Sequence, residues 1–97
     1  MKIEQIQHVL AIYETGSISK AAERFYLSRP NISNAVRNLE NKLGFEIMER
    51  GAKGVRFTKE GLLFVQKAVR ILKDVDEIQE IGNSRSRLRF GIVNPNC

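Results

Sequence analysis

The side chains best suited to chemistry lie in one stretch, residues 28–43, which reads SRPNISNAVRNLENKL. Its apolar residues are three and four apart, as on one face of a helix, and polar residues fill the opposite face. Arg pairs with guanine edges and Asn with adenine edges, whereas Ser hydroxyls and a helix N-terminus suit phosphates. The polar face is therefore a candidate surface for duplex DNA. Its members are Ser28, Arg29, Asn31, Ser33, Asn34 and Arg37.

Other kinds of chemistry have little support in the sequence. His8 is the only histidine and Cys97 the only cysteine, so neither a metal-ligand set nor an internal disulfide is expected. The sequence shows no nucleophile–base pair and no glycine-rich phosphate loop. Glu46 and Glu49 flank the start of a strand beside Arg50 and are interpreted as surface charges. We therefore expect no catalytic residue, no metal and no cofactor in this chain.

The charge of the chain favours a polyanionic partner. Its 97 residues include 16 Lys and Arg against 11 Asp and Glu, which gives a net charge of +5. Residues 20–56 contain eight basic and four acidic residues, so most of the excess lies around the polar helix. We find neither a membrane-spanning apolar run nor a signal-peptide pattern, and we expect a cytoplasmic protein without membrane contact.

Three helices are expected to position the polar face. Apolar spacing predicts them over residues 3–14, 18–25 and 28–43, with Gly16 and Gly44 at helix ends and Ser17 and Ser28 as N-caps. Pro30 fits the first turn of the third helix, where its missing N–H costs nothing. The second and third helices, joined by residues 26–28, predict a helix-turn-helix. Its small core is expected to hold Ala21, Ala22, Phe25, Leu27, Ile32 and Val36.

A hairpin is expected to follow the third helix. Residues 45–50 and 55–57 have strand character, and the sequence GAKG at 51–54 is the predicted loop. Arg50, Lys53 and Arg56 place cations around this loop, where the next minor groove or the phosphate backbone would lie. The alternative is that these cations and the polar helix face are the solvated surface of a helical bundle.

A long helix is predicted over residues 59–81, with Thr58 as its cap and the sequence GNSRS at 82–86 as its end. Its apolar residues step by four and three, which is a heptad seam and a predicted dimer interface. The seam consists of Phe64, Ala68, Ile71, Val75 and Ile78. A two-fold dimer would place two third helices on successive turns of one DNA face. The alternative is that another domain covers the seam.

The end of the chain, RLRFGIV at residues 87–93, alternates like a strand. A lone strand is unstable, so we expect it to begin a second domain that this chain lacks, with a frayed tail as the alternative. The expected organisation is a DNA-binding domain over 1–58, a linker and dimerisation helix over 59–81, and a hinge with the start of an effector-binding domain over 82–97.

Residues 16–61, GSISKAAERFYLSRPNISNAVRNLENKLGFEIMERGAKGVRFTKEG, resemble the signature of the LysR-type transcriptional regulators. The matching features are GS before the second helix, AAE within it, LS-P--S at the turn, LE--LG closing the third helix, ER at the hairpin and T-EG opening the long helix. The resemblance implies a mainly α fold: a winged helix-turn-helix with a three-helix core and a two-stranded wing, followed by a long dimerisation helix.

The resemblance also implies a function. It implies sequence-specific binding of double-stranded DNA by a homodimer, with the third helix in the major groove and the wing at the minor groove. A tetramer is an alternative assembly for the full-length protein. A small-molecule effector is expected only for a C-terminal domain. The alternative function is a winged-helix protein-interaction module without DNA binding.

Individual positions carry over from the family pattern. The resemblance places Ser28, Pro30, Ser33 and Arg37 on the recognition helix and Arg50 at the wing. Arg29 stands where Gln is commonest in the family, and Asn34 where Arg is commonest. The sequence preference of other members therefore does not transfer at these two positions. One hypothesis is that Arg29 favours a guanine.

Overall fold

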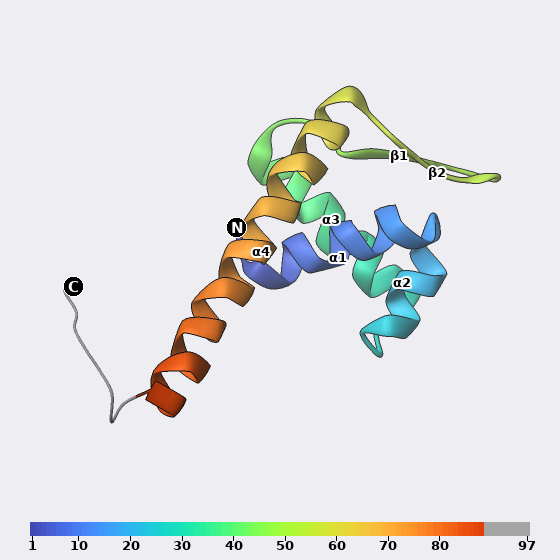
Figure 1. The fold of residues 1–97 in the computed structure, drawn as a ribbon. Coiled ribbons are helices and arrows are strands. Elements are labelled where there is room, and N and C mark those ends of the chain that lie inside the picture. Colours follow the sequence, from blue (N-terminus) through green and yellow to red (C-terminus); the bar gives the residue numbers. More distant parts are fainter. Residues whose placement is uncertain (89–97) are drawn as a thin grey trace.

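The computed structural model describes the backbone of residues 1–88 and the side chains up to residue 83. Helices α1 (Ile3–Thr15), α2 (Ile18–Arg24) and α3 (Arg29–Leu43) come first. Strands β1 (Met48–Gly51) and β2 (Gly54–Phe57) and the long helix α4 (Lys59–Leu88) follow. Figure 1 shows the hairpin projecting from one side of the helical body and the C-terminal half of α4 projecting from the other.

The predicted ends of the first helices are confirmed by their hydrogen bonds. Gly16 (φ 70°) and Gly44 (φ 84°) adopt the left-handed conformation that glycine enters without steric penalty. Each donates its N–H back into the helix that it ends, Gly16 to the Ile12 carbonyl at 2.8 Å and Gly44 to the Glu40 carbonyl at 2.8 Å. The Ser17 hydroxyl accepts the Lys20 N–H at 3.1 Å, which caps α2.

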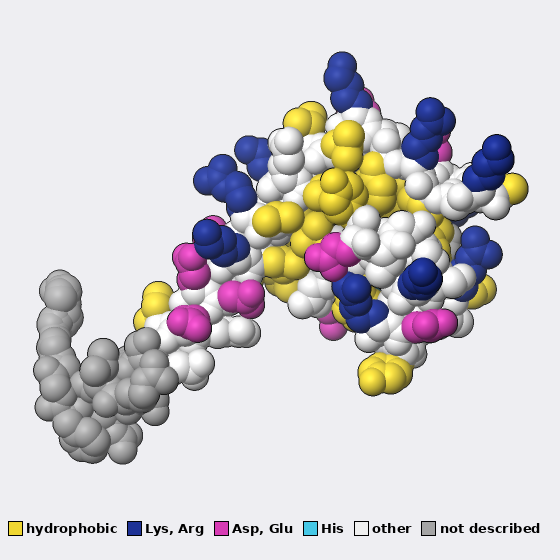
Figure 2. Space-filling view, turned by 45° about the vertical axis from the view of Figure 1, so that its right-hand side comes forward, with side chains coloured by type: hydrophobic (Ala, Val, Ile, Leu, Met, Phe, Trp, Pro, Cys, Tyr) yellow, Lys and Arg dark blue, Asp and Glu magenta, His cyan; other side chains and the backbone are white. Residues whose placement is uncertain are grey.

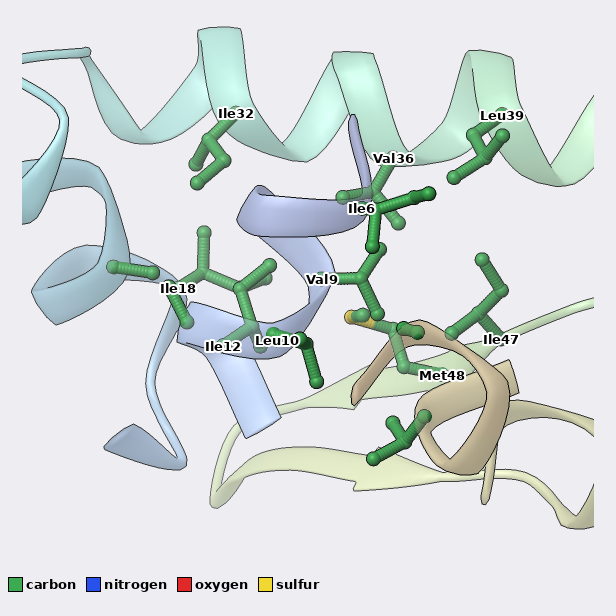
Figure 3. Packing of buried hydrophobic residues seen from close by; sticks show 14 of the residues in the cluster. Ile6, Val9, Leu10, Ile12, Ile18, Ile32, Val36, Leu39, Ile47 and Met48 are labelled. Atoms are coloured by element: carbon green, nitrogen blue, oxygen red, sulfur yellow. The ribbon is translucent and has the colours of Figure 1, made fainter. Parts of the chain in front are cut away.

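The hydrophobic core is built around α1, which packs against α2, α3 and α4. Ile32, Val36 and Leu39 line the inner face of α3, and Figure 3 shows them pointing toward the side chains of α1, with Ile47 below Leu39. Each of these side chains is buried, and burying one aliphatic side chain contributes about 1.5–3 kcal/mol. The orientation of α3 on the domain is therefore fixed by its apolar face.

The turn between α2 and α3 differs in part from the prediction. Tyr26 takes a left-handed conformation (φ 57°), and the N–H groups of Tyr26 and Leu27 donate to the Glu23 and Ala22 carbonyls at 3.2 and 2.9 Å. This pair of bonds closes α2 and reverses the chain. The predicted core position of Leu27 is wrong: its side chain is exposed, because the chain leaves the core at this turn, whereas Phe25 packs against the core.

The hairpin is tighter than predicted. Met48 pairs with Phe57, Arg50 with Val55 and Gly51 with Gly54, so both glycines belong to the antiparallel ladder and only residues 52 and 53 form the turn. The first strand begins at Met48 rather than at residue 45. The Ile47 N–H donates to the Glu40 carboxylate at 2.8 Å and its carbonyl accepts the Thr58 N–H at 3.0 Å, so this residue is bonded outside the ladder.

The long helix starts as predicted but ends later. The Thr58 hydroxyl accepts the Gly61 N–H at 2.9 Å, which confirms Thr58 as the cap. The predicted end at residue 81 is wrong, because α4 continues to Leu88. One Gly costs only about 1 kcal/mol in a helix, and the segment has no proline to remove a hydrogen bond. Residues 87 and 88 are therefore helical, and the rest of the predicted strand, 89–93, lies outside the described residues.

These elements make a winged helix-turn-helix. The described residues form a mainly helical fold with a two-stranded antiparallel wing, followed by a long helix. The fold class predicted from the sequence is confirmed.

Candidate nucleic-acid interface

The start of α3 is exposed and capped by its own sequence. The Ser28 hydroxyl accepts the Asn31 N–H at 3.2 Å, and Pro30 lies in the first turn, where no intrahelical hydrogen bond from its nitrogen is needed. Ser28, Arg29, Pro30 and Asn31 are all exposed. Free backbone N–H groups and a positive dipole end are thus presented to solvent beside a cationic side chain.

The outer face of α3 carries the remaining predicted contact residues. Asn34 and Arg37 are exposed and Ser33 is half-buried, and with Pro30 they recur every three or four residues along one side of the helix. Ile32, Val36 and Leu39 are buried on the other side. The structure therefore separates a core face from a polar face on the same helix, as the sequence predicts.

The wing directs its cations in two directions. Lys53 lies in the two-residue turn at its tip and is exposed. Arg56 is exposed and lies opposite Glu49 in the ladder, so these two side chains share the outer face of the hairpin. Arg50 and Val55, the next pair, face the body of the domain and are half-buried.

Arg50 is placed differently from the other predicted contact residues. Its side chain is only 17% exposed, and its Nη1 lies 3.5 Å from a carboxylate oxygen of Glu40. Its Nη2 donates to the Ser33 carbonyl at 3.4 Å. The structure thus brings Arg50 against α3, whereas Lys53 is exposed at the tip of the wing and Arg56 on its outer face.

A polar groove of about 320 Å³ joins α3 to the wing. Arg29 from α3 and Arg50 and Lys53 from the wing line it, together with Ser17 and Ser19 from the start of α2. Ser17 and Ser19 are not among the contact residues predicted from the sequence. Their signal was present in the motif GSIS, which puts two hydroxyls in and before the first turn of a helix, where phosphates bind well.

Basic side chains surround the globular part of the molecule in the view of Figure 2, whereas acidic side chains gather on the projecting part of α4. The acidic residues of that part are Asp74, Asp76, Glu77 and Glu80. An anionic partner is therefore attracted to the helix-turn-helix and wing rather than to residues 74–80 of α4.

The residues predicted to form a heptad seam are unequally accessible. Ala68 is 1% exposed and belongs to the core of the domain, and Phe64 packs against that core. Ile71 is 36% exposed, Val75 is half-buried and Ile78 is 66% exposed. The first part of the seam is thus covered by the chain itself, and its second part faces solvent.

His8 has a packing role. Its ring meets Phe25 edge to face, with 4.7 Å between the ring centroids, and its Nδ1 is buried without a hydrogen-bond partner among the described residues. Burial lowers the pKa of His8, and the nearby Glu4 carboxylate raises it by a smaller effect. Among the described residues, no three His, Cys, Asp or Glu side chains gather as a metal site would require. In that same part of the chain, no helix combines the length and apolarity needed to cross a membrane.

This fold and this surface define a helix-turn-helix protein with a basic wing. Residues 3–62 match the family described as "Bacterial regulatory helix-turn-helix protein, lysR family". The match covers more than half of the 97 residues. The chain therefore belongs to the LysR family of bacterial regulatory helix-turn-helix proteins, as the resemblance implied.

Relatives and solved structures agree with this assignment. The chain is 32% identical over 97 residues to the HTH-type transcriptional regulator BenM of Acinetobacter baylyi, covering 96% of this chain and 32% of BenM. It is 31% identical over 91 residues to the hydrogen peroxide-inducible genes activator of Pectobacterium carotovorum, covering 94% of this chain and 30% of the relative. The chain thus spans about a third of the length of the curated relatives it matches.

Among solved structures, the BenM DNA-binding domain in complex with catB site 1 DNA matches with a TM-score of 0.84 and 31% identity. The match covers 89% of this chain and 97% of that one. The CbnR DNA-binding domain in complex with DNA matches with a TM-score of 0.82 and 29% identity, over 89% of this chain and 99% of that one. The arrangement of helices and wing described above is therefore that of LysR-family DNA-binding domains.

Proposed function

We propose that this chain binds double-stranded DNA with sequence specificity, as the DNA-binding part of a transcription regulator. The observation that carries the proposal is the groove between Arg29 of α3 and Lys53 of the wing, flanked by the exposed polar face of α3. It combines the two exposed cations and the half-buried Arg50 with helix N-termini and a helix face that carries Asn and Arg side chains. The solved DNA complexes of the related BenM and CbnR domains support the same reading.

In this proposal α3 enters the major groove and the wing lies at the minor groove or the adjoining phosphates. A major groove is about 12 Å wide and admits one helix, whose N-terminal residues reach the base edges. Asn34 and Arg37 occupy the exposed side of that helix, and Lys53 lies at the tip of the wing and Arg56 on its outer face. Phosphate contacts set the position of the domain, and side chains of α3 read the bases.

We further propose that the functional unit is a dimer formed through α4. The helix has 30 residues and is about 45 Å long, and its second half projects beyond the body of the domain (Figure 1). Ile71, Ile78 and Ile81 are exposed large apolar side chains on this helix. Burying their side chains against a second copy removes apolar surface from water. The alternative is that another domain covers these apolar side chains in the full-length protein.

Location and ligands follow from the same proposal. A chromosomal DNA partner puts the protein in the bacterial cytoplasm. We assign the binding of any small-molecule effector to a part of the full-length protein outside this chain. Assembly beyond a dimer is likewise assigned to the full-length protein.

The DNA proposal is tested by selecting binding sites from random duplex DNA and measuring affinity at two salt concentrations. A dimer with about 6–10 phosphate contacts loses about 10³–10⁵ in affinity between 50 and 200 mM salt. Arg37→Ala should weaken binding without loss of helicity, because Arg37 is exposed. Lys73→Ala, which removes an exposed positive charge from α4, is the control. Absence of duplex binding at low salt would support the protein-interaction module instead.

The dimer proposal is tested by sedimentation at tens of micromolar. We expect Ile78→Asp to shift the population toward monomer, because it puts a charge in the apolar contact. Gln66→Asp places the same charge at an exposed position of the same helix outside the seam and should leave the dimer intact. A wild-type chain that sediments as a pure monomer would contradict the proposal.

A further inference from the structure

Glu40 is a carboxylate buried inside the junction between α3 and the wing. The residue is 8% exposed, and among the described residues no other charged residue is buried. Its Oε2 accepts two backbone N–H groups, from Ile47 at 2.8 Å and from Met48 at 3.2 Å. A buried charge is costly unless it is paired and hydrogen-bonded, so this side chain has a strong preference for one arrangement.

Arg50 completes the arrangement from the wing. Its Nη1 lies 3.5 Å from Oε1 of Glu40, and its Nη2 donates to the Ser33 carbonyl at 3.4 Å. Ser33 and Glu40 are seven residues apart, which is two turns of α3, so the guanidinium lies along the side of the helix. Its Nε is buried without a hydrogen-bond partner among the described residues, so the guanidinium is held through Nη1 and Nη2.

We propose that Glu40 and Arg50 are positioning residues that fix the wing on the recognition helix, and that Arg50 does not contact DNA. Glu40 holds the entry to β1 through two backbone N–H groups, and Arg50 holds β1 itself. The separation between the polar face of α3 and the wing tip is therefore already fixed in the free protein, before it binds DNA. This inference rests on the proposed DNA binding, and it assigns Arg50 a role distinct from those of Lys53 and Arg56.

The two possible roles of Arg50 predict opposite effects of neutralising Glu40. If Arg50 contacted phosphate, Glu40→Gln would free it and remove a repulsive charge, so DNA affinity would rise. If the pair positions the wing, Glu40→Gln lowers affinity although it makes the protein more positive. Glu46 supplies the matched control. It is exposed, and together with Glu40, Arg37 and Arg50 it lines a second groove of about 410 Å³.

The experiment compares wild type, Glu40→Gln and Glu46→Gln on duplex DNA selected with the wild-type protein. Glu40→Gln should bind on the order of 2- to 30-fold more weakly, the range for residues that couple two sites without touching the ligand. Glu46→Gln should bind as well as wild type or better. Affinity for Glu40→Gln equal to or above that of Glu46→Gln would overturn the proposal.

The dependence of affinity on salt separates a positioning residue from a phosphate ligand. Loss of one phosphate contact lowers the slope of log affinity against log salt by about 0.9. We expect Lys53→Ala to show this loss and Arg50→Ala to weaken binding with the slope unchanged. Arg50→Lys keeps the charge but loses the planar guanidinium that donates to two acceptors at once. It should weaken binding as Arg50→Ala does. A slope reduced by Arg50→Ala as much as by Lys53→Ala would overturn the proposal.

A measurement on the free protein tests the positioning without DNA. Amide hydrogen exchange at Ile47 and Met48 should become faster in Glu40→Ala, which removes the acceptor of these N–H groups, and stay unchanged in Glu46→Ala. Unchanged exchange in Glu40→Ala would refute the positioning role. If exchange responds as expected but the wild type binds no duplex DNA, the proposed function fails and the structural pairing stands.

Discussion

Gly61 in the first turn of α4 lies against the carbonyl of Ile47, at the entry to β1. A Cβ on Gly61 would stand 1.9 Å from that oxygen and 2.8 Å from the carbon that carries it. The same carbonyl accepts the Thr58 N–H at 3.0 Å, and the Thr58 hydroxyl donates to the neighbouring Glu46 carbonyl at 2.5 Å. The base of the wing and the start of α4 are therefore held at one point, and only a glycine allows the approach.

Gly61→Ala should destabilise the domain by about 1–3 kcal/mol, the usual range for forcing atoms into a packed site. Gly82→Ala is the matched control, because its Cβ would meet nothing within 4 Å and its φ is ordinary for a helix. Ala is preferred over Gly by about 1 kcal/mol inside a helix, so the control should gain stability. Urea unfolding of both variants decides the matter, and equal midpoints would contradict the proposed contact.

Much of this arrangement could be predicted from local patterns. Apolar spacing and caps gave the first three helices within one or two residues, since both signals depend on neighbours in the chain. The end of α4 was not predictable in this way. The residues after Ile81 have a composition typical of linkers, yet an existing helix extends through them at a cost of about 1 kcal/mol for one Gly.

The role of Arg50 shows what local patterns leave out. Strand alternation indicates that Arg50 shares a face with Met48, and that Glu49 and Arg56 face the other way. This pattern could have set Arg50 apart from Arg56. It could not show that the inner face of the wing meets Glu40, because that contact joins residues of different elements and depends on how the hairpin docks on α3.

Tyr26→Gly should stabilise the domain. Tyr26 has φ 57°, and its side chain is 96% exposed, so the substitution removes backbone strain with little loss of contact. The left-handed conformation costs a non-glycine residue about 1–2 kcal/mol, so we expect a gain of about 1 kcal/mol. Tyr26→Ala keeps a Cβ and should change stability by less than about 0.5 kcal/mol. Thermal unfolding of the two variants measures the difference, and a destabilised Tyr26→Gly would contradict the turn geometry.

His8 should make the domain less stable in mild acid. Burial lowers the pKa of His8 in the folded state below the ordinary histidine value of 6.5, so the unfolded chain takes up the proton more readily. The stability associated with neutral His8 is complete above pH 6.5 and is lost as the pH falls toward the folded-state pKa. His8→Gln does not titrate and should lose less stability between pH 8 and 5.5. Urea unfolding of both proteins at the two pH values isolates this effect, because carboxylate titration is common to both. Parallel losses would refute it.

Arg29 and Lys53 line one groove but should contribute differently to DNA binding. Arg29 is at the first position of α3, where an exposed guanidinium can reach a guanine edge, and such a bidentate pair discriminates by about 1–3 kcal/mol. Arg29→Ala should therefore relax preference at one base pair in each half-site. Lys53→Ala should instead weaken binding to all sequences alike and lower the salt slope, as expected for a phosphate contact. Binding-site selection with the two variants distinguishes these outcomes. If Arg29→Ala kept the wild-type preference at every base pair, Arg29 would not be a base-reading residue, and Asn34 would be the next side chain of α3 to test.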